Sequence, residues 1–377
     1  MFAGAVLAAA LAATAIAIFV VHAGGASAPP AAGLAGSGAP FNVVQATQPA
    51  PPASASAITG RVDPGLVNIT VANSSTGAAG EATGMVLTRS GVVLTNNHVI
   101  QGATQISATD VGNGKTYSAS VVGYDRTGDV AVIQLHGASR LQTVPLGDSS
   151  TVAISGKVLA LGNAGGGGGT PRAAQGAVTA LAQAITASDI GGGNAERLAG
   201  LIQTDAAVLP GDSGGPLVND GGQVVGMDAA ASSASTPFIA QTSSPQAFAI
   251  PIDTALAIAK QIEAGTSSAT VHVGQTGFLG VEVVPTSQLR GGSSNGGGSE
   301  TQGALVGGAL PGYPAARIGL AQGDVITSVD GQAVTTPSGL TDLLSAHHPG
   351  DAVLLRWSDT SGQTHSASVR LASGPAA

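Results

Sequence analysis

Residues 210–218, Pro-Gly-Asp-Ser-Gly-Gly-Pro-Leu-Val, constrain the fold and chemistry of this chain more than any other segment. Glycines on both sides of Ser213 allow a tight backbone turn without Cβ clashes. Such a turn leaves the N–H groups of Gly211 and Ser213 free to point at one spot, as an oxyanion hole requires. A simple turn between two strands, the alternative, does not require these residues in this order. The segment therefore predicts a nucleophilic serine, which needs a neighbouring base.

Among the seven histidines, His98 has the setting expected of that base. Residues 91–95, Gly-Val-Val-Leu-Thr, indicate a buried strand. His98 follows two asparagines after that strand, and a base at a strand end is held rigidly with its ring at an open edge. His136, at the end of another expected strand, is the alternative. The sequence favours His98.

A carboxylate is needed to set the imidazole tautomer and to stabilise the imidazolium. Asp129 immediately precedes the apolar run 130–135, where a buried carboxylate would be costly without a partner. Asp125 ranks second, because it lies beside Arg126 and can form a solvated ion pair instead. Asp205 can serve as a turn or capping residue. The sequence therefore favours Asp129.

The order His98, Asp129, Ser213 resembles that of the HtrA/Deg family of trypsin-like serine proteases, above all the secreted or membrane-anchored HtrA-type proteases of mycobacteria and other actinobacteria. The resemblance extends from about Val67 to about Leu371. It implies an all-β, chymotrypsin-like protease domain of two barrels, the first with His98 and Asp129 and the second with Ser213. Three segments carry it: Thr-Asn-Asn-His-Val-Ile at 95–100, Gly-Asp-Val-Ala-Val at 128–132, and Thr-Asp-Ala-Ala at 204–207 ahead of the serine segment.

Two features depart from the family pattern or bear on specificity. Asp212 stands where many HtrA proteins have Asn. The expected oxyanion hole is formed by the backbone of the turn Gly211, Asp212 and Ser213. In the chymotrypsin group this Asp can pair with a newly cut N-terminus, but no activation site is evident here, and the partner of Asp212 stays open. By similarity to trypsin-like enzymes, Ala207 forms the base of the S1 pocket, and Ala231 and Ala247 lie in its walls. A pocket lined by methyl groups favours a small or medium apolar P1 residue. In the alternative, these alanines only fill the core of the barrel.

The segment Gly-Phe-Leu-Gly-Val at 277–281 opens a second domain, which resembles a PDZ domain of mixed α/β structure. In that fold a peptide adds as a strand to a sheet edge, and backbone N–H groups hold its terminal carboxylate. Leu340, Leu343 and Leu344 recur at helical spacing and are expected to line the peptide-binding groove. In the alternative, Leu343 or Leu344 packs in the core of the domain instead. The expected peptide-binding residues are Phe278, Leu279, Gly280, Val281, Leu340 and Leu344.

The N-terminal part of the chain predicts a targeting segment and a spacer. Residues 1–23 are almost wholly apolar and, as a helix, are long enough to span a bilayer, so they form either a membrane anchor or a signal peptide. Residues 24–58 are rich in Ala, Pro and Gly and predict a flexible linker. The remaining expected boundaries are a protease domain at 59–265, a linker at 266–275 and a PDZ domain at 276–373.

Composition narrows the possible partners. A formal net charge of −8 without a Lys/Arg cluster argues against nucleic acid as the main ligand. The chain has no cysteine, so neither a disulfide nor a thiolate metal site can form, and no motif calls for a metal or cofactor. A charged content of 9% with 57 glycines and 20 prolines is typical of an all-β chain with many turns.

Together these features predict an extracytoplasmic serine endopeptidase that is either membrane-anchored or secreted. It would hydrolyse misfolded or envelope proteins through an acyl-enzyme, and its PDZ domain would bind peptide C-termini. The alternative is a peptide-binding chaperone or scaffold in which proteolysis is latent. The resemblance also allows a homotrimer. Two loops, at 191–194 and 230–244, match the positions of regulatory loops in the family, and 291–298 forms an insert in the PDZ domain.

Overall fold

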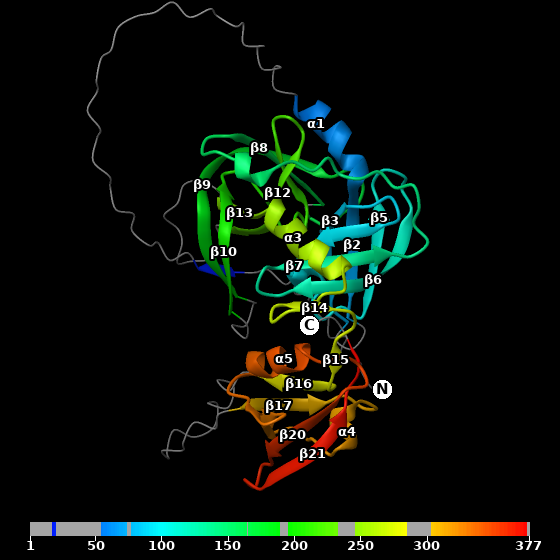
Figure 1. The fold of residues 1–377 in the computed structure, drawn as a ribbon, viewed down its shortest axis with the longest axis vertical. Coiled ribbons are helices and arrows are strands. Elements are labelled where there is room, and N and C mark those ends of the chain that lie inside the picture. Colours follow the sequence, from blue (N-terminus) through cyan, green and yellow to red (C-terminus); the bar gives the residue numbers. More distant parts are fainter. Residues whose placement is uncertain are drawn as a thin grey trace, which may run out of the picture.

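The computed structural model describes residues 17–19, 54–73, 77–163, 165–188, 195–232, 246–284 and 303–374. Two antiparallel β-barrels lie side by side, and a smaller domain of strands and helices follows them (Figure 1). The all-β domain of two barrels and the mixed α/β domain predicted from the sequence are therefore confirmed as architecture.

The first barrel is formed by six consecutive strands, and β7 pairs with both β4 and β6, which closes the sheet. β-Branched side chains alternate inward along these strands and make an apolar interior around Ile69, Val93 and Ile133. Helix α1 (Ala55–Val62) and the 3-10 turn η1 (Asp63–Gly65) precede the barrel. The strands are β2 (Leu66–Ala72), β3 (Ala79–Val86), β4 (Val92–Thr95), β5 (Gln105–Asp110), β6 (Thr116–Asp125) and β7 (Val130–Leu135), with helix α2 (Asn97–Ile100) after β4.

The second barrel repeats this plan, and β9 pairs with β8 to close it. The turn η2 (Ser149–Thr151) precedes it. The serine segment lies between β10 and β11, so the barrel supplies Ser213 on a connection, where a side chain can reach a neighbouring domain. The strands are β8 (Lys157–Gly162), β9 (Arg172–Ser188), β10 (Ala195–Thr204), β11 (Pro216–Asn219), β12 (Val224–Ser232) and β13 (Gln246–Pro251).

An apolar layer joins the two barrels. One cluster of buried residues contains Leu66 and Leu94 from the first barrel together with Leu161 and Met227 from the second. Helix α3 (Ile252–Glu263) contributes its buried face to the same cluster. Because the barrels share this layer, loops from both are held at their junction.

The C-terminal domain is a sheet in the order β16-β17-β18-β20-β21, with β19 paired to β18 and β15 paired to β22. Its core contains Trp357 together with Leu340 and Leu344 of α5. Strand β16 is at the edge of the sheet. The elements are β15 (Gly277–Phe278), β16 (Val281–Val284), β17 (Ala304–Ala309), α4 (Pro314–Arg317), β18 (Val325–Val329), β19 (Gln332–Ala333), α5 (Pro337–Ser345), β20 (Ala352–Ser358), β21 (Thr364–Arg370) and β22 (Ala372–Ser373).

Several segments differ from the sequence expectation or fall outside the described residues. Within the apolar segment 1–23, expected to be helical, residues Ala17–Phe19 form strand β1, paired with β9. Outside a bilayer, an apolar stretch can satisfy its backbone groups on a sheet edge instead. The rest of 1–23 lies outside the described residues, as do 191–194, 233–244 and 291–298. None of the helices in the described part of the chain is long and apolar enough to cross a membrane.

Two expected linkers contain ordered elements. Helix α1 begins at Ala55, inside the segment 24–58, with Ser54 as its N-cap. Within 266–275, Val271–Val273 form β14, which extends the first barrel by pairing with β6. The connection between the domains is thus fixed to the first barrel rather than free.

Candidate active site

His98 and Asp129 are in direct contact at the rim of the first barrel. Nδ1 of the His98 ring lies 2.9 Å from Oδ2 and 3.1 Å from Oδ1 of Asp129, and the backbone N–H of His98 donates to Oδ1 at 3.0 Å. A carboxylate accepts, so the neutral ring carries its proton on Nδ1. Nε2 is then the basic nitrogen, the state a general base requires.

The backbone around Asp129 is built to present its carboxylate. Asp129 has a φ of 51°, in the left-handed region that Asp tolerates better than most residues. Its N–H donates to the carbonyl of Arg126 at 3.1 Å, and its own carbonyl accepts from the Asn96 side chain at 3.0 Å. Strain of about 1–3 kcal/mol at such a position is typical of functional sites.

The turn that carries Ser213 is docked on the first barrel. The N–H of Thr83 in β3 donates to the Ser213 carbonyl at 2.9 Å, and the Thr83 hydroxyl donates to the Gly211 carbonyl at 2.8 Å. The Thr95 hydroxyl donates in turn to the Thr83 carbonyl at 2.8 Å. Because Thr95 ends β4, three residues before His98, these bonds bring the serine turn to the strand that leads into the histidine.

Gly214 shows why the serine is followed by glycine. It has a φ of +81°, and a Cβ there would lie 2.2 Å from both the Thr83 carbonyl oxygen and the Thr95 hydroxyl oxygen. None of the hydrogen bonds among the described residues involves the Ser213 hydroxyl. Contacts between nucleophile and base are often long in free enzymes and shorten when substrate binds.

The expected oxyanion hole has the backbone that such a site needs. Gly211 has a φ of +99°. Asp212 donates its N–H to the Leu209 carbonyl at 3.0 Å, and Gly215 donates to the Asp212 carbonyl at 2.8 Å. In the described part of the chain no hydrogen bond uses the N–H groups of Gly211 or Ser213. Both donors are thus available to a developing negative charge.

The alternative residues have other partners. Asp125 accepts from the Thr127 hydroxyl at 2.8 Å, from the Gly128 N–H at 3.0 Å and from the Thr270 hydroxyl at 2.9 Å. It therefore stabilises the turn ahead of Asp129. Asp205 accepts from the Ala177 N–H at 2.6 Å, as a turn residue does, and His136 is exposed.

The expected S1 alanines occupy different environments. Ala231 and Ala247 face each other in the register of β12 and β13, and Ala247 is buried in the interior of the second barrel. Ala207 is half-buried, and its carbonyl accepts from Nη1 of Arg172 at 2.8 Å. The preference for a small apolar P1 residue stays a prediction.

Two buried carboxyl groups lie behind the serine turn. Asp212 accepts the Leu209 N–H at 2.9 Å on Oδ2, and Nη1 of Arg172 lies 3.8 Å from the same oxygen. Asp228 is fully buried; burial and, second, the charge of Asp212 raise its pKa well above the usual value. Sequence reasoning missed Asp228, although a carboxyl inside the apolar run 224–231 was a visible signal.

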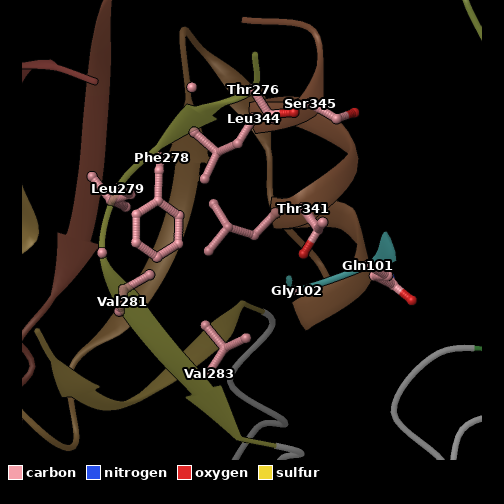
Figure 2. Close-up of a pocket in the computed structure, with 13 residues that line it drawn as sticks. Gln101, Gly102, Thr276, Phe278, Leu279, Val281, Val283, Thr341, Leu344 and Ser345 are labelled. Atoms are coloured by element: carbon pink, nitrogen blue, oxygen red, sulfur yellow. The ribbon is translucent and has the colours of Figure 1, made fainter. Parts of the chain in front are cut away.

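The C-terminal domain holds a cavity of about 210 Å³ beside α5 and the edge strand β16 (Figure 2). All six residues expected to bind peptide line it. Sequence reasoning missed Gln101 and Gly102, which come from the first barrel just after α2, because no local pattern reveals a contact between domains. The lining residues are Gln101, Gly102, Thr276, Gly277, Phe278, Leu279, Gly280, Val281, Val283, Leu340, Thr341, Leu344 and Ser345.

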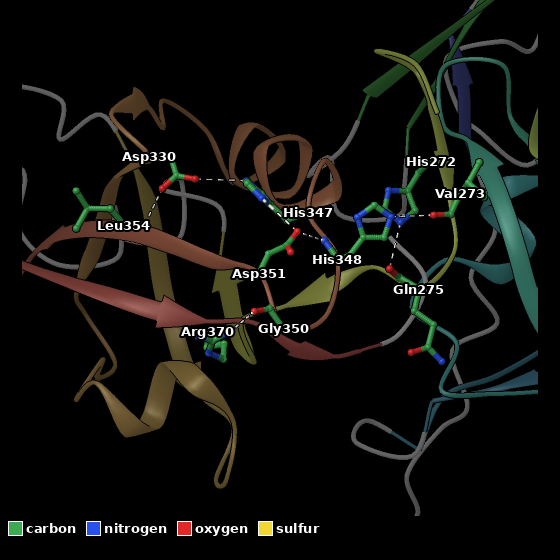
Figure 3. A network of polar contacts seen from close by, with 10 residues as sticks. All are labelled: His272, Val273, Gln275, Asp330, His347, His348, Gly350, Asp351, Leu354 and Arg370. Atoms are coloured by element: carbon green, nitrogen blue, oxygen red, sulfur yellow. Dashed lines mark hydrogen bonds and ion pairs between the residues drawn. The ribbon is translucent and has the colours of Figure 1, made fainter. Parts of the chain in front are cut away.

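Aromatic and polar contacts fix the C-terminal domain to the first barrel. The His272 ring of β14 stacks on Tyr124 at 5.2 Å and on His348 at 4.8 Å between centroids. Figure 3 shows His348, whose Nε2 lies 2.9 Å from the Val273 carbonyl oxygen. The Tyr124 hydroxyl bonds to that of Thr276 at 2.8 Å. The cavity and the His98–Asp129 pair are therefore supported by the same barrel.

Comparison with known proteins agrees with this architecture. Residues 82–227 match the trypsin-like peptidase domain and residues 305–357 the PDZ domain. The chain is 33% identical over 336 residues to "Serine protease PepD" of Mycobacterium tuberculosis, covering 85% of this chain and 66% of that protein. It is 34% identical over 278 residues to "Probable periplasmic serine endoprotease DegP-like" of Halomonas elongata, covering 73% and 52%.

A third relative, "Putative serine protease HhoA" of Synechocystis, is 34% identical over 259 residues, covering 68% of this chain and 62% of that protein. The chain thus spans between about half and two thirds of the length of these relatives. The resemblance read from the catalytic motifs is confirmed by both domain matches. The chain belongs to the HtrA/DegP-like family of trypsin-like serine proteases that carry a PDZ domain.

Proposed function

We propose that this chain is a serine endopeptidase in which Ser213 is the nucleophile, His98 the general base and Asp129 the residue that orients it. The contact of 2.9 Å between Nδ1 of His98 and Oδ2 of Asp129 carries the proposal. It is supported by the serine turn, which hydrogen-bonds to the strand next to the one that leads into His98.

In this mechanism Nε2 of His98 takes the Ser213 proton while the serine oxygen attacks the peptide carbonyl. The N–H groups of Gly211 and Ser213 stabilise the oxyanion, and Asp129 stabilises the imidazolium. His98 then gives its proton to the leaving amine, which leaves an acyl-enzyme. A water molecule, activated by His98, hydrolyses the ester and restores the serine.

The PDZ cavity would bind the C-termini of peptides. A bound peptide would extend the sheet at β16, with apolar side chains against α5. Within the described residues no hydrogen bond uses the N–H groups of Leu279 and Gly280, which suits them to a terminal carboxylate. The relative from Halomonas elongata is named as a probable periplasmic endoprotease, which supports an extracytoplasmic location for this chain. Misfolded or envelope proteins are the proposed substrates.

Labelling with a fluorophosphonate probe tests the proposed protease. The wild-type chain should label, and Ser213→Ala should abolish labelling because the probe reacts with the activated hydroxyl. His98→Ala should reduce the labelling rate by at least about a thousandfold. The control is His136→Ala, an exposed histidine, which should label as the wild type does. Absence of labelling in folded wild-type protein, with and without a C-terminal peptide, would overturn the assignment.

A peptide-binding chaperone with latent proteolysis is the second candidate, and the cavity beside α5 supports it. Binding of a fluorescent peptide with an apolar C-terminus to Ser213→Ala protein tests the groove apart from catalysis. Thr341→Arg should fill the groove and weaken binding, whereas Thr335→Arg, at an exposed position outside it, should not. Equal binding of free-carboxylate and amidated peptides would contradict the expected recognition mode.

A further inference from the structure

Asp212 is a buried carboxylate on the turn that must be ordered for catalysis. The turn packs so closely on the end of β8 that a Cβ at Gly162 would lie 2.5 Å from the Asp212 Cα. A carboxylate at such a place needs compensation, because a buried charge without a partner is costly. The sequence left this partner open.

Arg172, the first residue of β9, supplies positive charge at this point. Its Nη1 lies 3.8 Å from Oδ2 of Asp212 and donates to the Ala207 carbonyl at 2.8 Å. One guanidinium therefore contacts both ends of the segment 207–212, which leads into Ser213. The Arg172 side chain is 41% exposed and that of Asp212 only 3%, so the cation approaches from solvent while the carboxylate faces inward.

We propose that Arg172 is a positioning residue that orders the serine turn by compensating the charge of Asp212, the role that a freed N-terminal amine has in the chymotrypsin group. This inference rests on the proposed function. A countercharge within the chain needs no proteolytic activation, so the turn can be ordered as soon as the two barrels have folded and packed together.

Asp228 supports the same arrangement. Its N–H donates to the Gly215 carbonyl and its carbonyl accepts from the Gly214 N–H, both at 2.8 Å, so its carboxyl group is held behind the turn. Burial and, second, the charge of Asp212 raise the pKa of Asp228, which favours its neutral form. Ala249, opposite Asp228 in β13, carries no charge.

A double-mutant cycle tests this role. Arg172→Ala should lower kcat/KM for a peptide substrate about tenfold, mainly through kcat, because the disordered turn affects the transition state more than binding. In the Asp212→Asn background the same substitution should have no effect, since Asn carries no charge to compensate. Arg172→Lys should recover part of the activity. Lys157→Ala, an exposed cation at the far end of β8, is the control and should equal the wild type.

A second readout separates this proposal from the protease assignment. In Ser213→Ala protein, hydrogen exchange at the Gly214 and Gly215 amides should be about tenfold faster in Arg172→Ala, and unchanged by Arg172→Ala once Asp212 is Asn. Equal effects of Arg172→Ala in both backgrounds would overturn the proposal and assign Arg172 to the Ala207 carbonyl alone. Loss of hydrolysis in all variants, with this exchange pattern intact, would refute the protease and leave the positioning role standing.

Discussion

Arg126 and Asp342 form an ion pair that joins the turn ahead of Asp129 to helix α5, which lines the cavity of the C-terminal domain. The Arg126 carbonyl also accepts the Asp129 N–H at 3.1 Å. A single residue thus contacts both the backbone of Asp129, the proposed orienting carboxylate, and the PDZ domain.

Asp342→Asn should loosen the contact between the domains. The Asp342 side chain is 65% exposed, so the pair contributes at most about 1 kcal/mol and is screened by salt. Hydrogen exchange over residues 271–276 should become up to about fivefold faster at low salt, and the difference should vanish at about 1 M salt. Asp220→Asn, on an exposed turn of the second barrel, should change nothing. An equal exchange rate at low salt would contradict this coupling.

Gly214→Ala should displace the turn that carries Ser213 and so reduce the reactivity of the serine. The new Cβ would lie 2.2 Å from Thr83 and Thr95 oxygens, so the turn must move away from the first barrel. The rate of fluorophosphonate labelling should fall at least about a hundredfold. Gly200→Ala is the matched control, because Gly200 also has a positive φ (+74°) but nothing within 4 Å of its Cβ position. It should cost about 1 kcal/mol of stability from backbone strain and leave labelling intact.

Asp129→Asn should impair the orientation of the His98 ring without unfolding the protein. Asn can donate to Nδ1 of His98 and so favours the wrong tautomer, which should lower kcat by up to about 10⁴-fold. Asp125→Asn is the control four residues away. It loses hydrogen bonds to Thr127, Gly128 and Thr270, so it should lower the free energy of unfolding by about 1–3 kcal/mol yet retain most of kcat. Comparable losses of kcat in both variants would contradict the assignment of Asp129.

Asp228→Asn should make the free energy of unfolding depend less on a rise in pH above about 4. Because the folded-state pKa of Asp228 lies well above 3.8, the folded protein keeps a proton that the unfolded chain releases. The free energy of unfolding therefore falls as pH rises from about 4 through the folded pKa. Chemical unfolding of Ser213→Ala protein at a series of pH values should show this fall, and Asp228→Asn should remove it. A slope that persists in the variant would assign the effect to another group.

His272→Phe should make the stability of the protein depend less on a fall in pH below about 6.5. Burial, the largest cause, lowers the pKa of His272 from 6.5, so the unfolded chain binds a proton that the folded protein excludes. Stability is thus lost as pH falls below about 6.5. Phe keeps the stack between Tyr124 and His348 but cannot titrate, so its melting temperature should depend less on acid pH. His136→Phe, at an exposed site, should leave the acid slope unchanged.

The sequence alone identified the three catalytic candidates, because each one follows or precedes a recognisable element. Ser213 is flanked by Gly211 and Gly214, His98 follows an apolar strand by three residues, and Asp129 precedes a β-branched strand. These are local patterns of turn residues and hydrophobic periodicity, so they can be recognised from the sequence alone. The residues expected to bind peptide, on α5 and on the segment from β15 to β16, were also named from local patterns, and they line one cavity; their binding of peptide stays a prediction.

Only the tertiary structure decided which distant residues meet. Thr83 and Thr95 hold the serine turn from the other barrel, Arg172 approaches Asp212 across 40 residues of sequence, and Gln101 enters the PDZ cavity from the first barrel. Such contacts arise from barrel closure and domain packing, which leave no periodic trace in the sequence. The chain's residues thus specify the reactive groups locally, and the fold supplies their partners.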